Sequence, residues 1–394
     1  MNINHPIPES VATEGRELVI VVADDRFFLS HRLEVGMAAI AKGWNVTIAG
    51  GENGSGPSIE AAGFGYIPLP SPHSGQGPIS SMLTIRHLVA LFHERRDAVF
   101  HFVGVKMILL GNLAAKIAGT SGCIINAYSG LGIAFQNPAS YKARVISAAL
   151  RILCRGKKNS VNIIQNHDDE EILNSRHIIS LNTTEYIKGS GVNLKKFSHP
   201  TGLAYLPDGR MRVVFSGRLL KSKGVEDLIA AAELLRPRWE NKVEFLICGA
   251  CHHNPDSMRP EQMERLCDGK YIVWGGHINN MNEVLASSRI MAFPSYYREG
   301  VPLALIEASA AGLPIVTCDS VGCRDTIDGN GFLVEPRNPF QLAQCIERLL
   351  EDDDLCLKFG RRSRQLAEVY YDIKDVVKKH LDIYSRSLTS NYSV

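Results

Sequence analysis

The chain has 394 residues, of which 45% are hydrophobic and 21% charged, close to the average of a globular protein. At roughly 100–200 residues per domain, this length predicts two or three domains. The 43 lysines and arginines nearly balance the 41 aspartates and glutamates, and a net charge of +2 gives no bulk field for nucleic acid, so we predict no nucleic-acid partner. No apolar run reaches the length of about 18 residues that a membrane-spanning helix needs.

The first residues, 1–15, have neither a basic start nor an apolar stretch, so we expect a disordered tail and not a signal peptide. The nine cysteines are scattered, which is typical of free thiols in a reducing cytoplasm. Cys248, Cys251 and His252 match the C-x-x-C-H pattern of haem attachment. Cys248 is the last residue of the strand-like run VEFLIC, so we interpret this cluster as the end of a strand that continues into a loop.

Short apolar runs alternate with helical patterns through the first half of the chain. Continuously apolar strands separated by helices are typical of a parallel sheet that is covered on both faces. The strand-like runs are LVIVVA (18–23), NVTIAG, YIPL, AVFHFV and CIINAY, and the helical patterns cover about 31–42, 78–94 and 106–118.

A second series of the same kind follows a stretch, 182–210, that is rich in Gly, Pro, Asn and Ser and is typical of a linker. The series begins at 212–217 and has a helix from Gly224 to Arg236 with one apolar stripe. Its strand-like runs are RVVFSG, VEFLIC, YIVWGG, RIMAFP, PIVTC and GFLVEP.

The fold class predicted from these patterns is α/β, with two doubly wound (Rossmann-like) parallel-sheet domains that face a cleft. We expect an N-terminal domain over 16–190, a C-terminal domain over 191–370, and a C-terminal helix over 371–394 that crosses back to the first domain. Ligands of such sheets bind outside the carboxyl ends of the strands, so the site is expected in the cleft.

The segment 294–317 predicts an anion-binding helix N-terminus. A strand ends near Pro294, and Pro302 suits the first turn of the helix that follows. The backbone N–H groups from Gly300 to Leu303 are therefore expected to be free and to point outward. Phosphate is the usual ligand of such a helix start.

Two carboxylates flank this anion site, Glu299 before the helix and Glu307 further along it. A phosphate would repel them, but as acceptors they suit the hydroxyl groups of a sugar or a ribose. This combination fits a nucleoside diphosphate sugar. The alternative is structural, with Glu299 as a charge that complements the helix dipole and Glu307 on a solvated face.

The loop after 212–217 is the second candidate site. Gly217 permits close approach of the backbone to a ligand, and Arg218, Lys221 and Lys223 follow before a helix. Arg218 and Lys223 can neutralise two negative charges. Basic residues between a strand and a helix are also common as surface charges, but their position at a strand's carboxyl end favours a functional role.

The motif EGVPLALIE (299–307) resembles the E-x₇-E signature of the family-4 retaining glycosyltransferases, which have the GT-B architecture of two domains. SGRLLKSKG is similar to that family's phosphate-binding loop, GSGVNLKKF (189–197) to its interdomain linker, and GNGFLVEP (329–336) to the strand and turn after its donor site. The N-terminal half resembles the branch that acts on undecaprenyl-diphosphate-linked saccharides of O-antigen, capsule and N-glycan assembly, often with UDP-N-acetylhexosamines. The segments similar to that branch are 27–50, 101–119 and 126–138.

The resemblance implies a role for each candidate residue. Glu299 would hold hydroxyl groups of the donor sugar, Glu307 the ribose, and Arg218 and Lys223 the diphosphate. The remaining donor-site residues would be Gly217, Trp274 and Gly275 (near the base), Gly300, Val301, Pro302 and Leu303. The acceptor side would be lined by Ser129, Gly130, Leu131 and Gly132.

Two features depart from the family's pattern. Many relatives have a Gly-Gly pair after the first strand, where this chain has Ala23-Asp24-Asp25-Arg26. Many also have a histidine in the N-terminal domain that faces the donor sugar, and the corresponding stretch NAYSG has none, which leaves His31 or His101 as a substitute on the acceptor side. His101 follows Phe100 in an apolar strand and also fits a buried core histidine.

The resemblance further implies a transfer that retains the anomeric configuration, in which the leaving diphosphate helps to take the acceptor's proton. No carboxylate pair with the roles found in glycosidases is evident. Because Arg218 and Lys223 would stabilise the departing diphosphate, we predict that no metal and no cofactor are required. The D-x-D within Asp352-Asp353-Asp354 lies between two helical patterns and fits a helix start.

Residues 139–158 have the pattern of a basic amphipathic helix. Such a helix can lie on an anionic membrane surface, and the alternative is a core-facing helix with a solvated basic edge. We expect a cytoplasmic protein that is peripheral at the inner face of the membrane. The shared apolar face is Val145, Ala149, Ile152 and Leu153, and the cations are Lys142, Arg144, Arg151, Arg155, Lys157 and Lys158.

The favoured function is a glycosyltransferase that moves a sugar, an N-acetylhexosamine, from a UDP-sugar donor to a lipid-linked saccharide acceptor. One alternative is an isomerase like the UDP-N-acetylglucosamine 2-epimerases, which have a similar shape and convert the donor without an acceptor. The other is a non-catalytic subunit that binds a nucleotide sugar for a partner enzyme.

Overall fold

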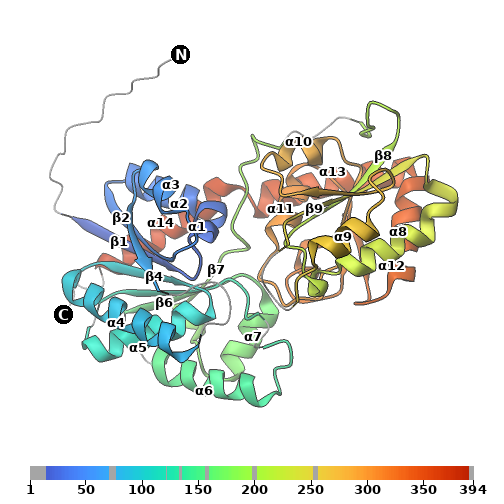
Figure 1. Ribbon diagram of the computed structural model, residues 1–394. Coiled ribbons are helices and arrows are strands. Elements are labelled where there is room, and N and C mark those ends of the chain that lie inside the picture. The colour runs from blue at the N-terminus through green and yellow to red at the C-terminus, as the bar shows by residue number, and fades with distance from the viewer. Residues whose placement is uncertain are drawn as a thin grey trace.

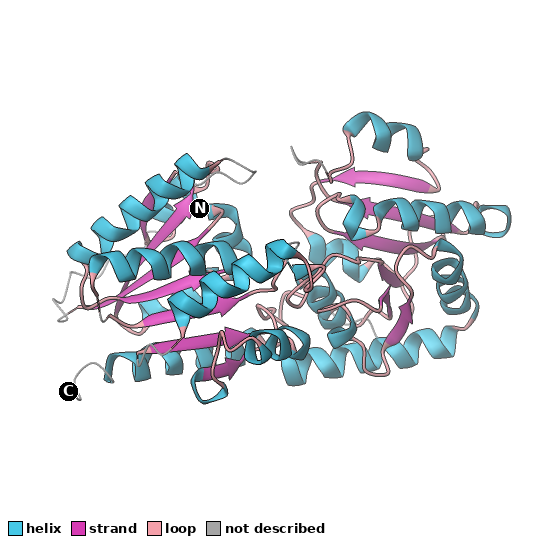
Figure 2. Cartoon of the chain, turned by 90° about the horizontal axis from the view of Figure 1, so that it is seen from below, coloured by secondary structure: helices cyan, strands magenta, loops and turns pink. Residues whose placement is uncertain are grey.

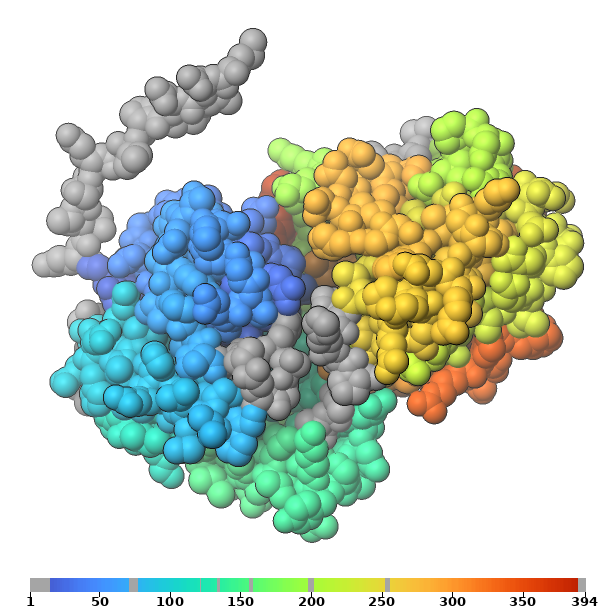
Figure 3. All heavy atoms as spheres, viewed as in Figure 1, coloured from blue at the N-terminus to red at the C-terminus, as the bar shows by residue number. Residues whose placement is uncertain are grey.

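The computed structural model describes residues 15–70, 77–120, 122–132, 135–155, 159–197, 202–251 and 256–389. The tail predicted over 1–15, apart from its last residue, lies outside these residues, as do His252, Lys157 and Lys158. The described chain forms two domains, each built on a parallel sheet (Figure 1). In a space-filling view they form two lobes with a notch between them at the upper edge (Figure 3).

The N-terminal domain has, in its described residues, a seven-stranded sheet in the order β3-β2-β1-β4-β5-β6-β7, and every neighbouring pair is parallel. Its strands are β1 (Arg16–Val22), β2 (Trp44–Gly51), β3 (Gly65–Leu69), β4 (Val99–Val103), β5 (Ile124–Tyr128), β6 (Ser160–Ile164) and β7 (Thr184–Tyr186). Its helices are α1 (Asp25–His31), α2 (Leu33–Ala41), α3 (Gly56–Ala61), α4 (Pro78–Glu94), α5 (Val105–Ala118), α6 (Tyr141–Cys154), α7 (His167–Ser175) and the short η2 (Leu181–Thr183).

The C-terminal domain has a six-stranded parallel sheet within the described part, in the order β10-β9-β8-β11-β12-β13. Its strands are β8 (Met211–Ser216), β9 (Val243–Cys248), β10 (Ile272–Gly276), β11 (Ile290–Phe293), β12 (Ile315–Cys318) and β13 (Gly331–Val334). Its helices are η3 (Lys221–Lys223), α8 (Val225–Trp239), α9 (Pro260–Leu266), α10 (Met281–Ala286), α11 (Leu303–Ala310), η4 (Arg324–Thr326), α12 (Pro339–Glu351) and α13 (Asp353–Tyr370).

Both faces of the N-terminal sheet are buried, because successive side chains of a strand point to opposite faces. In β1, Val19 and Val21 pack in one core with side chains of α4, α5 and α6, whereas Ile20 packs in a second core with α1 and α2. Helices accordingly lie on both sides of each sheet (Figure 2). This double burial explains the continuously apolar strands and confirms the predicted α/β class with two doubly wound domains.

The last helix, α14 (Ile373–Thr389), returns from the C-terminal domain to the N-terminal sheet. Its Val376, Ile383 and Tyr384 are buried in the same core as Ile20 of β1. The chain crosses at Asp372, which forms an isolated parallel bridge with Val192. None of the described helices is both long and apolar enough to cross a membrane.

Three local elements differ from the sequence predictions. The segment predicted as a linker, 182–210, contains β7, the edge strand of the first sheet, which follows η2. Its three residues, Thr184 to Tyr186, are too few and too polar to show a hydrophobic period. β6 was not predicted either. The helix predicted over 31–42 is α2, which begins at Leu33, and an additional helix, α1, precedes it and ends at His31. The backbone of Arg32 between them (φ −134°, ψ −2°) is not helical.

Candidate active site

The two candidate donor loops lie where the strand order of the C-terminal sheet reverses. β8 and β11 are neighbours, and the chain continues from them to opposite halves of the sheet. Gly217 to Lys223 follow β8, and Pro294 to Pro302 follow β11. Such a switch point is where ligands bind in doubly wound sheets. The backbone N–H groups of Tyr296 and Tyr297 both donate to the carbonyl of Ser222 at 3.0 Å, which joins the two loops.

The loops bring Lys223 and Glu299 into direct contact. Lys223 is only 7% exposed, and its Nζ forms an ion pair with Oε1 of Glu299. The hydroxyl of Ser295 donates to the same oxygen at 3.2 Å. The ammonium group also lies 5.1 Å from the ring centre of Phe293 and 5.6 Å from that of Tyr297. A charged pair is therefore held in a largely desolvated corner between the two donor loops, walled by aromatic rings.

His31, from the end of α1 in the other domain, lies near these cations. Burial lowers the pKa of His31 to about 3, and the positive charges of Arg32, Lys223 and Arg218 lower it as well. Its ring stacks on Phe27 with 4.1 Å between ring centres. His31 is thus neutral at physiological pH. The charge of Arg218, a residue that is exposed at the edge of the site, acts on the His31 ring.

Glu307 lies on α11, half-buried, and burial raises its pKa to about 7. Within the described residues, no group donates a hydrogen bond to its carboxylate. This is not the environment of a solvated helix face. Glu307 is instead an acceptor that can gain hydrogen bonds from a ligand.

The helix start differs in two ways from the prediction. Pro302 is the N-cap, with φ −62° and ψ 125°, so α11 begins at Leu303. The N–H of Val301, expected to be free, donates to Oε1 of Gln165 at 3.2 Å. The prediction was wrong at Val301 because the acceptor belongs to the other domain, and a sequence pattern cannot reveal such a neighbour.

The predicted acceptor-side loop, Ser129 to Gly132, follows β5 and lies against the donor loop. Gly130 has φ +96°, and a Cβ there would lie 2.5 Å from the Gly300 nitrogen and 2.8 Å from the carbonyl carbon of Glu299. A Cβ on Gly132 would lie 3.4 Å from the Tyr297 hydroxyl oxygen. Gly130 therefore allows the two domains to approach to backbone contact at this point.

Trp274 and Gly275 lie in β10, at the same edge of the C-terminal sheet as the donor loops. The indole N–H of Trp274 donates to the carbonyl of Gly249 at 3.0 Å. Gly249 follows β9, and a Cβ there would collide with the carbonyl of Gly217. The loops after β8 and β9 and the end of β10 thus lie side by side, with Gly275 exposed.

His101 is a core residue. It is fully buried in β4, and its Nδ1 lies 2.8 Å from the Tyr384 hydroxyl of α14. Its ring centre is 5.8 Å from that of His380, and burial holds its pKa well below the usual value. The acceptor-side role predicted for His101 is therefore wrong, because α14 covers this face of β4.

The Asp pair that replaces the glycines after β1 is used structurally. Asp25 is fully buried, and its Oδ2 accepts hydrogen bonds from the backbone N–H groups of Asn53 (2.9 Å) and Ser55 (3.0 Å) and from the Tyr66 hydroxyl (3.2 Å). Asp24 caps α1 by accepting from the N–H of Arg26. The loops after β1 and β2 are therefore fixed to each other.

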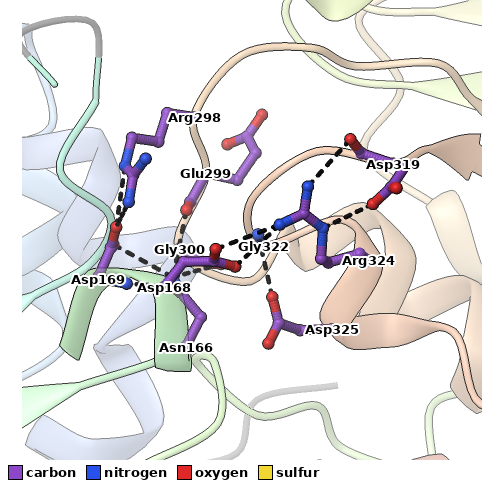
Figure 4. Close-up of polar contacts among 10 residues, drawn as sticks. All are labelled: Asn166, Asp168, Asp169, Arg298, Glu299, Gly300, Asp319, Gly322, Arg324 and Asp325. Atoms are coloured by element: carbon purple, nitrogen blue, oxygen red, sulfur yellow. Dashed lines mark hydrogen bonds and ion pairs between the residues drawn. The ribbon is translucent and has the colours of Figure 1, made fainter. Parts of the chain in front are cut away.

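A set of contacts between the domains was not predicted from the sequence (Figure 4). Asn166 and Asp169, at the start of α7, contact Gly300 and Arg298 of the donor loop. A local signal for these contacts is the polar run that begins at Gln165, directly after the apolar strand β6. That strand was not predicted, so the polar run was not recognised as part of the site.

The other candidate clusters have structural roles. Cys248 is the last residue of β9, as interpreted, and the cysteines of the described residues are free thiols. Asp352 caps α13, also as interpreted. Among the residues described, no group of three or more His, Cys, Asp or Glu side chains could hold a metal ion.

Comparisons with known proteins agree with this architecture. The family model described as Glycosyl transferase 4-like matches residues 18–167, and the model described as Glycosyl transferases group 1 matches residues 210–352. The N,N'-diacetylbacillosaminyl-diphospho-undecaprenol alpha-1,3-N-acetylgalactosaminyltransferase of Campylobacter jejuni is 30% identical over 211 residues, or 51% of this chain and 54% of the relative. The UDP-Gal:alpha-D-GlcNAc-diphosphoundecaprenol alpha-1,3-galactosyltransferase of Escherichia coli is 23% identical over 319 residues, or 78% of this chain and 80% of the relative.

The chain spans about half the length of the Campylobacter relative, and likewise 54% of the putative glycosyltransferase EpsD of Bacillus subtilis, to which it is 27% identical over 216 residues. Solved structures show the same fold over nearly the whole chain. Sucrose-phosphate synthase from Thermosynechococcus elongatus has a TM-score of 0.77 at 19% identity and covers 95% of this chain and 100% of its own. Anabaena HepE in complex with UDP and glucose has a TM-score of 0.71 at 16% identity and covers 93% and 99%.

The two family models match the two domains in turn, the first over the N-terminal sheet and the second over the donor loops. The fold is the two-domain GT-B architecture that the sequence resemblance implied. The chain belongs to the glycosyltransferases of the group 1 and GT4-like families.

Proposed function

We propose that the protein is a retaining glycosyltransferase that moves an N-acetylhexosamine from a UDP-sugar to a lipid-diphosphate-linked saccharide. The observation that supports this most is the Lys223–Glu299 pair at the β8/β11 switch point, beside Arg218. Cations for a diphosphate and carboxylates for hydroxyl groups meet there, as a nucleotide sugar requires. The Campylobacter relative is named for N-acetylgalactosamine transfer to an undecaprenol-linked saccharide, and the E. coli relative for UDP-galactose.

In this proposal the donor rearranges the charged pair. The diphosphate competes with Glu299 for the ammonium of Lys223, and the freed carboxylate accepts hydrogen bonds from hydroxyl groups of the sugar. Arg218 neutralises the second phosphate. Glu307 accepts hydrogen bonds from the ribose, and Trp274 lies on the side of the base.

The transfer breaks the bond between the anomeric carbon and the diphosphate oxygen and forms a bond from the same face to an acceptor hydroxyl. The acceptor's proton passes to the departing diphosphate. Lys223 and Arg218 stabilise the charge that develops on the diphosphate, and they do so in a site that is already organised. We propose that this charge stabilisation makes a metal ion unnecessary, so activity should persist in EDTA.

We also propose that α6 attaches the protein to the inner face of the cytoplasmic membrane, where a lipid-linked acceptor lies. The core-facing side of α6 is a separate stripe that includes Leu150. Its outer side leaves Tyr141 83%, Val145 49% and Ile152 66% exposed. Exposed cations flank this apolar edge, and each contributes about 1 kcal/mol of attraction near an anionic surface. They are Lys142, Arg144, Arg151 and Arg155.

One experiment tests the function. Purified protein is mixed with UDP-N-acetylhexosamines and a synthetic undecaprenyl-diphosphate sugar, the products are identified by mass spectrometry, and the anomeric configuration by NMR. Transfer with retained configuration supports the proposal. Conversion of the donor without an acceptor indicates an epimerase, and UDP-sugar binding without turnover of any donor and acceptor indicates a binding subunit.

A further inference from the structure

The junction between β6 and α7 contacts the opposite domain through four side chains. Gln165 and Asn166 lie between the two elements, and Asp168 and Asp169 lie in the first turn of α7 (Figure 4). Among them, Asp169 is completely buried, with an exposed fraction of 0%. Its Oδ1 accepts from Nε and Nη2 of Arg298 at 3.0 and 2.6 Å. Arg298 is itself 8% exposed and directly precedes Glu299, so this ion pair holds the donor loop from the other side of the cleft.

The second oxygen of the same carboxylate holds the acceptor-side loop. Oδ2 of Asp169 accepts from the backbone N–H of Leu131 at 3.2 Å and from the side-chain amide of Asn166 at 3.2 Å. Leu131 follows Gly130, which lies against Gly300. One buried carboxylate therefore connects the loop after β5 with the loop after β11.

Two neighbours of Asp169 fix the backbone of the donor loop. The side-chain amide of Asn166 donates to the carbonyl of Gly300 at 3.2 Å, and Gln165 accepts from the N–H of Val301 at 3.2 Å. The residues on either side of Glu299, Arg298 and Gly300, are thus both hydrogen-bonded to the N-terminal domain. Its own backbone N–H donates to the carbonyl of Val321 at 3.3 Å.

We propose that Asp169 is a positioning residue for sugar transfer: through Arg298 and Leu131 it sets the register of Glu299 against the glycine loop of the acceptor side. This rests on the proposed function. The nucleotide contacts proposed above all lie in the C-terminal domain, so loss of Asp169 should affect turnover and leave UDP binding intact. A displacement of about 1 Å at a reacting centre lowers a rate by about 100-fold.

The adjacent residue supplies a matched control. Asp168 also forms an ion pair across the domains, with Arg324 at 3.2 Å, but the side chains are 34% and 39% exposed. Exposed pairs contribute little, whereas removal of one partner of a buried pair leaves an uncompensated charge. Asp168→Asn and Asp169→Asn therefore make the same chemical change at neighbouring interdomain contacts.

The first measurement is kinetic, on the full-length protein with the donor and lipid-linked acceptor identified above. We expect Asp169→Asn to lower kcat by about 10–100-fold and to change the Kd of UDP, measured by calorimetry, by less than about twofold. Asp168→Asn should stay within about twofold of wild type in both. Wild-type kcat in Asp169→Asn, or an equal loss of kcat and UDP affinity, would overturn the positioning role.

A double variant separates positioning from stability. Asp169→Asn with Arg298→Gln removes both charges and leaves no buried unpaired guanidinium, so its melting temperature should recover toward that of wild type. Its kcat should stay low. A double variant with wild-type kcat would mean that the pair serves only stability, which would refute the proposal.

Hydrogen exchange gives a result that does not depend on turnover. In Asp169→Asn the amides of Leu131 and Val301 should exchange at least about tenfold faster than in wild type, and in Asp168→Asn they should not. Unchanged exchange would overturn the register argument even for an active enzyme. If wild type transfers no sugar at all while exchange responds as expected, the failure lies in the proposed function.

Discussion

Glu307 should make folding stability and UDP binding respond to pH in opposite directions. Burial raises the pKa of its carboxyl from 4.5 to about 7. At about 1.4 kcal/mol per pKa unit, and reduced for water that still reaches the half-buried side chain, ionisation costs the folded state roughly 2–3 kcal/mol. Since the folded pKa lies above the unfolded one, the stability contribution is complete below pH 4.5 and is lost as the pH rises through about 7.

Glu307→Gln removes this titration and keeps the shape of the side chain. Denaturant unfolding at a series of pH values should therefore show the variant more stable than wild type by roughly 2–3 kcal/mol at pH 8, with the difference vanishing near pH 4.5. The UDP affinities of the two proteins should have the opposite order, with wild type favoured at high pH. A charged acceptor bonds a ribose hydroxyl about 1 kcal/mol more strongly than a neutral one, so at pH 8 the variant should bind UDP about fivefold more weakly.

At pH 5.5 wild-type Glu307 is protonated, and the two proteins should bind UDP with similar affinity. Because both proteins are compared in the same buffer, the titration of UDP itself cancels. Calorimetry in buffers of different ionisation enthalpy should detect that wild type releases protons when it binds UDP near pH 6.5. Parallel stability curves for the two proteins would refute the burial argument. Equal UDP affinity at pH 8 would refute the ribose role.

Further predictions concern the other parts of the site. Arg218→Ala should lower kcat/KM by about 10–150-fold, because a charge-assisted hydrogen bond contributes about 1.5–3 kcal/mol, and wild-type kinetics would remove Arg218 from the site. Gly130→Ala should lower kcat by about 100-fold with unchanged UDP affinity, since the new Cβ meets the backbone of Gly300; undiminished turnover would show that the loops need not touch. Val145→Asp with Ile152→Asp should reduce sedimentation with anionic vesicles by more than tenfold at an unchanged melting temperature, and undiminished sedimentation would contradict a membrane role for α6.

Some of the site was predictable because its signals are local. The central strands of both sheets, such as β1, β4, β9 and β11, are buried along most of their length and are therefore recognisable as apolar runs. The helix after β11 has its boundary marked by Pro302 and Gly312. Glu299, Lys223 and Arg218 were identified because each lies between such a strand and the helix that follows it. Parallel strands bring these loop residues to one edge of the sheet.

Other features required the packed chain. The sequence named both His31 and His101 as possible substitutes, with an apolar strand context that also fits a core position for His101. The crossing of α14 over β4 shows that His101 is buried, whereas His31 lies near Lys223. Similarly, β7 is too short and polar to show a period, so its place at the sheet edge depends on pairing with β6.

The amino-acid sequence by itself determined the fold class, the family resemblance and the residues of the donor loops, because these depend on periodicity and on short motifs. The tertiary structure alone decided which N–H groups are free and which residues join the domains. Val301 is engaged by Gln165, and Arg298 by Asp169, 136 and 129 residues away along the chain. Contacts at such separations are set by how two independently patterned domains pack, and no local pattern encodes that packing.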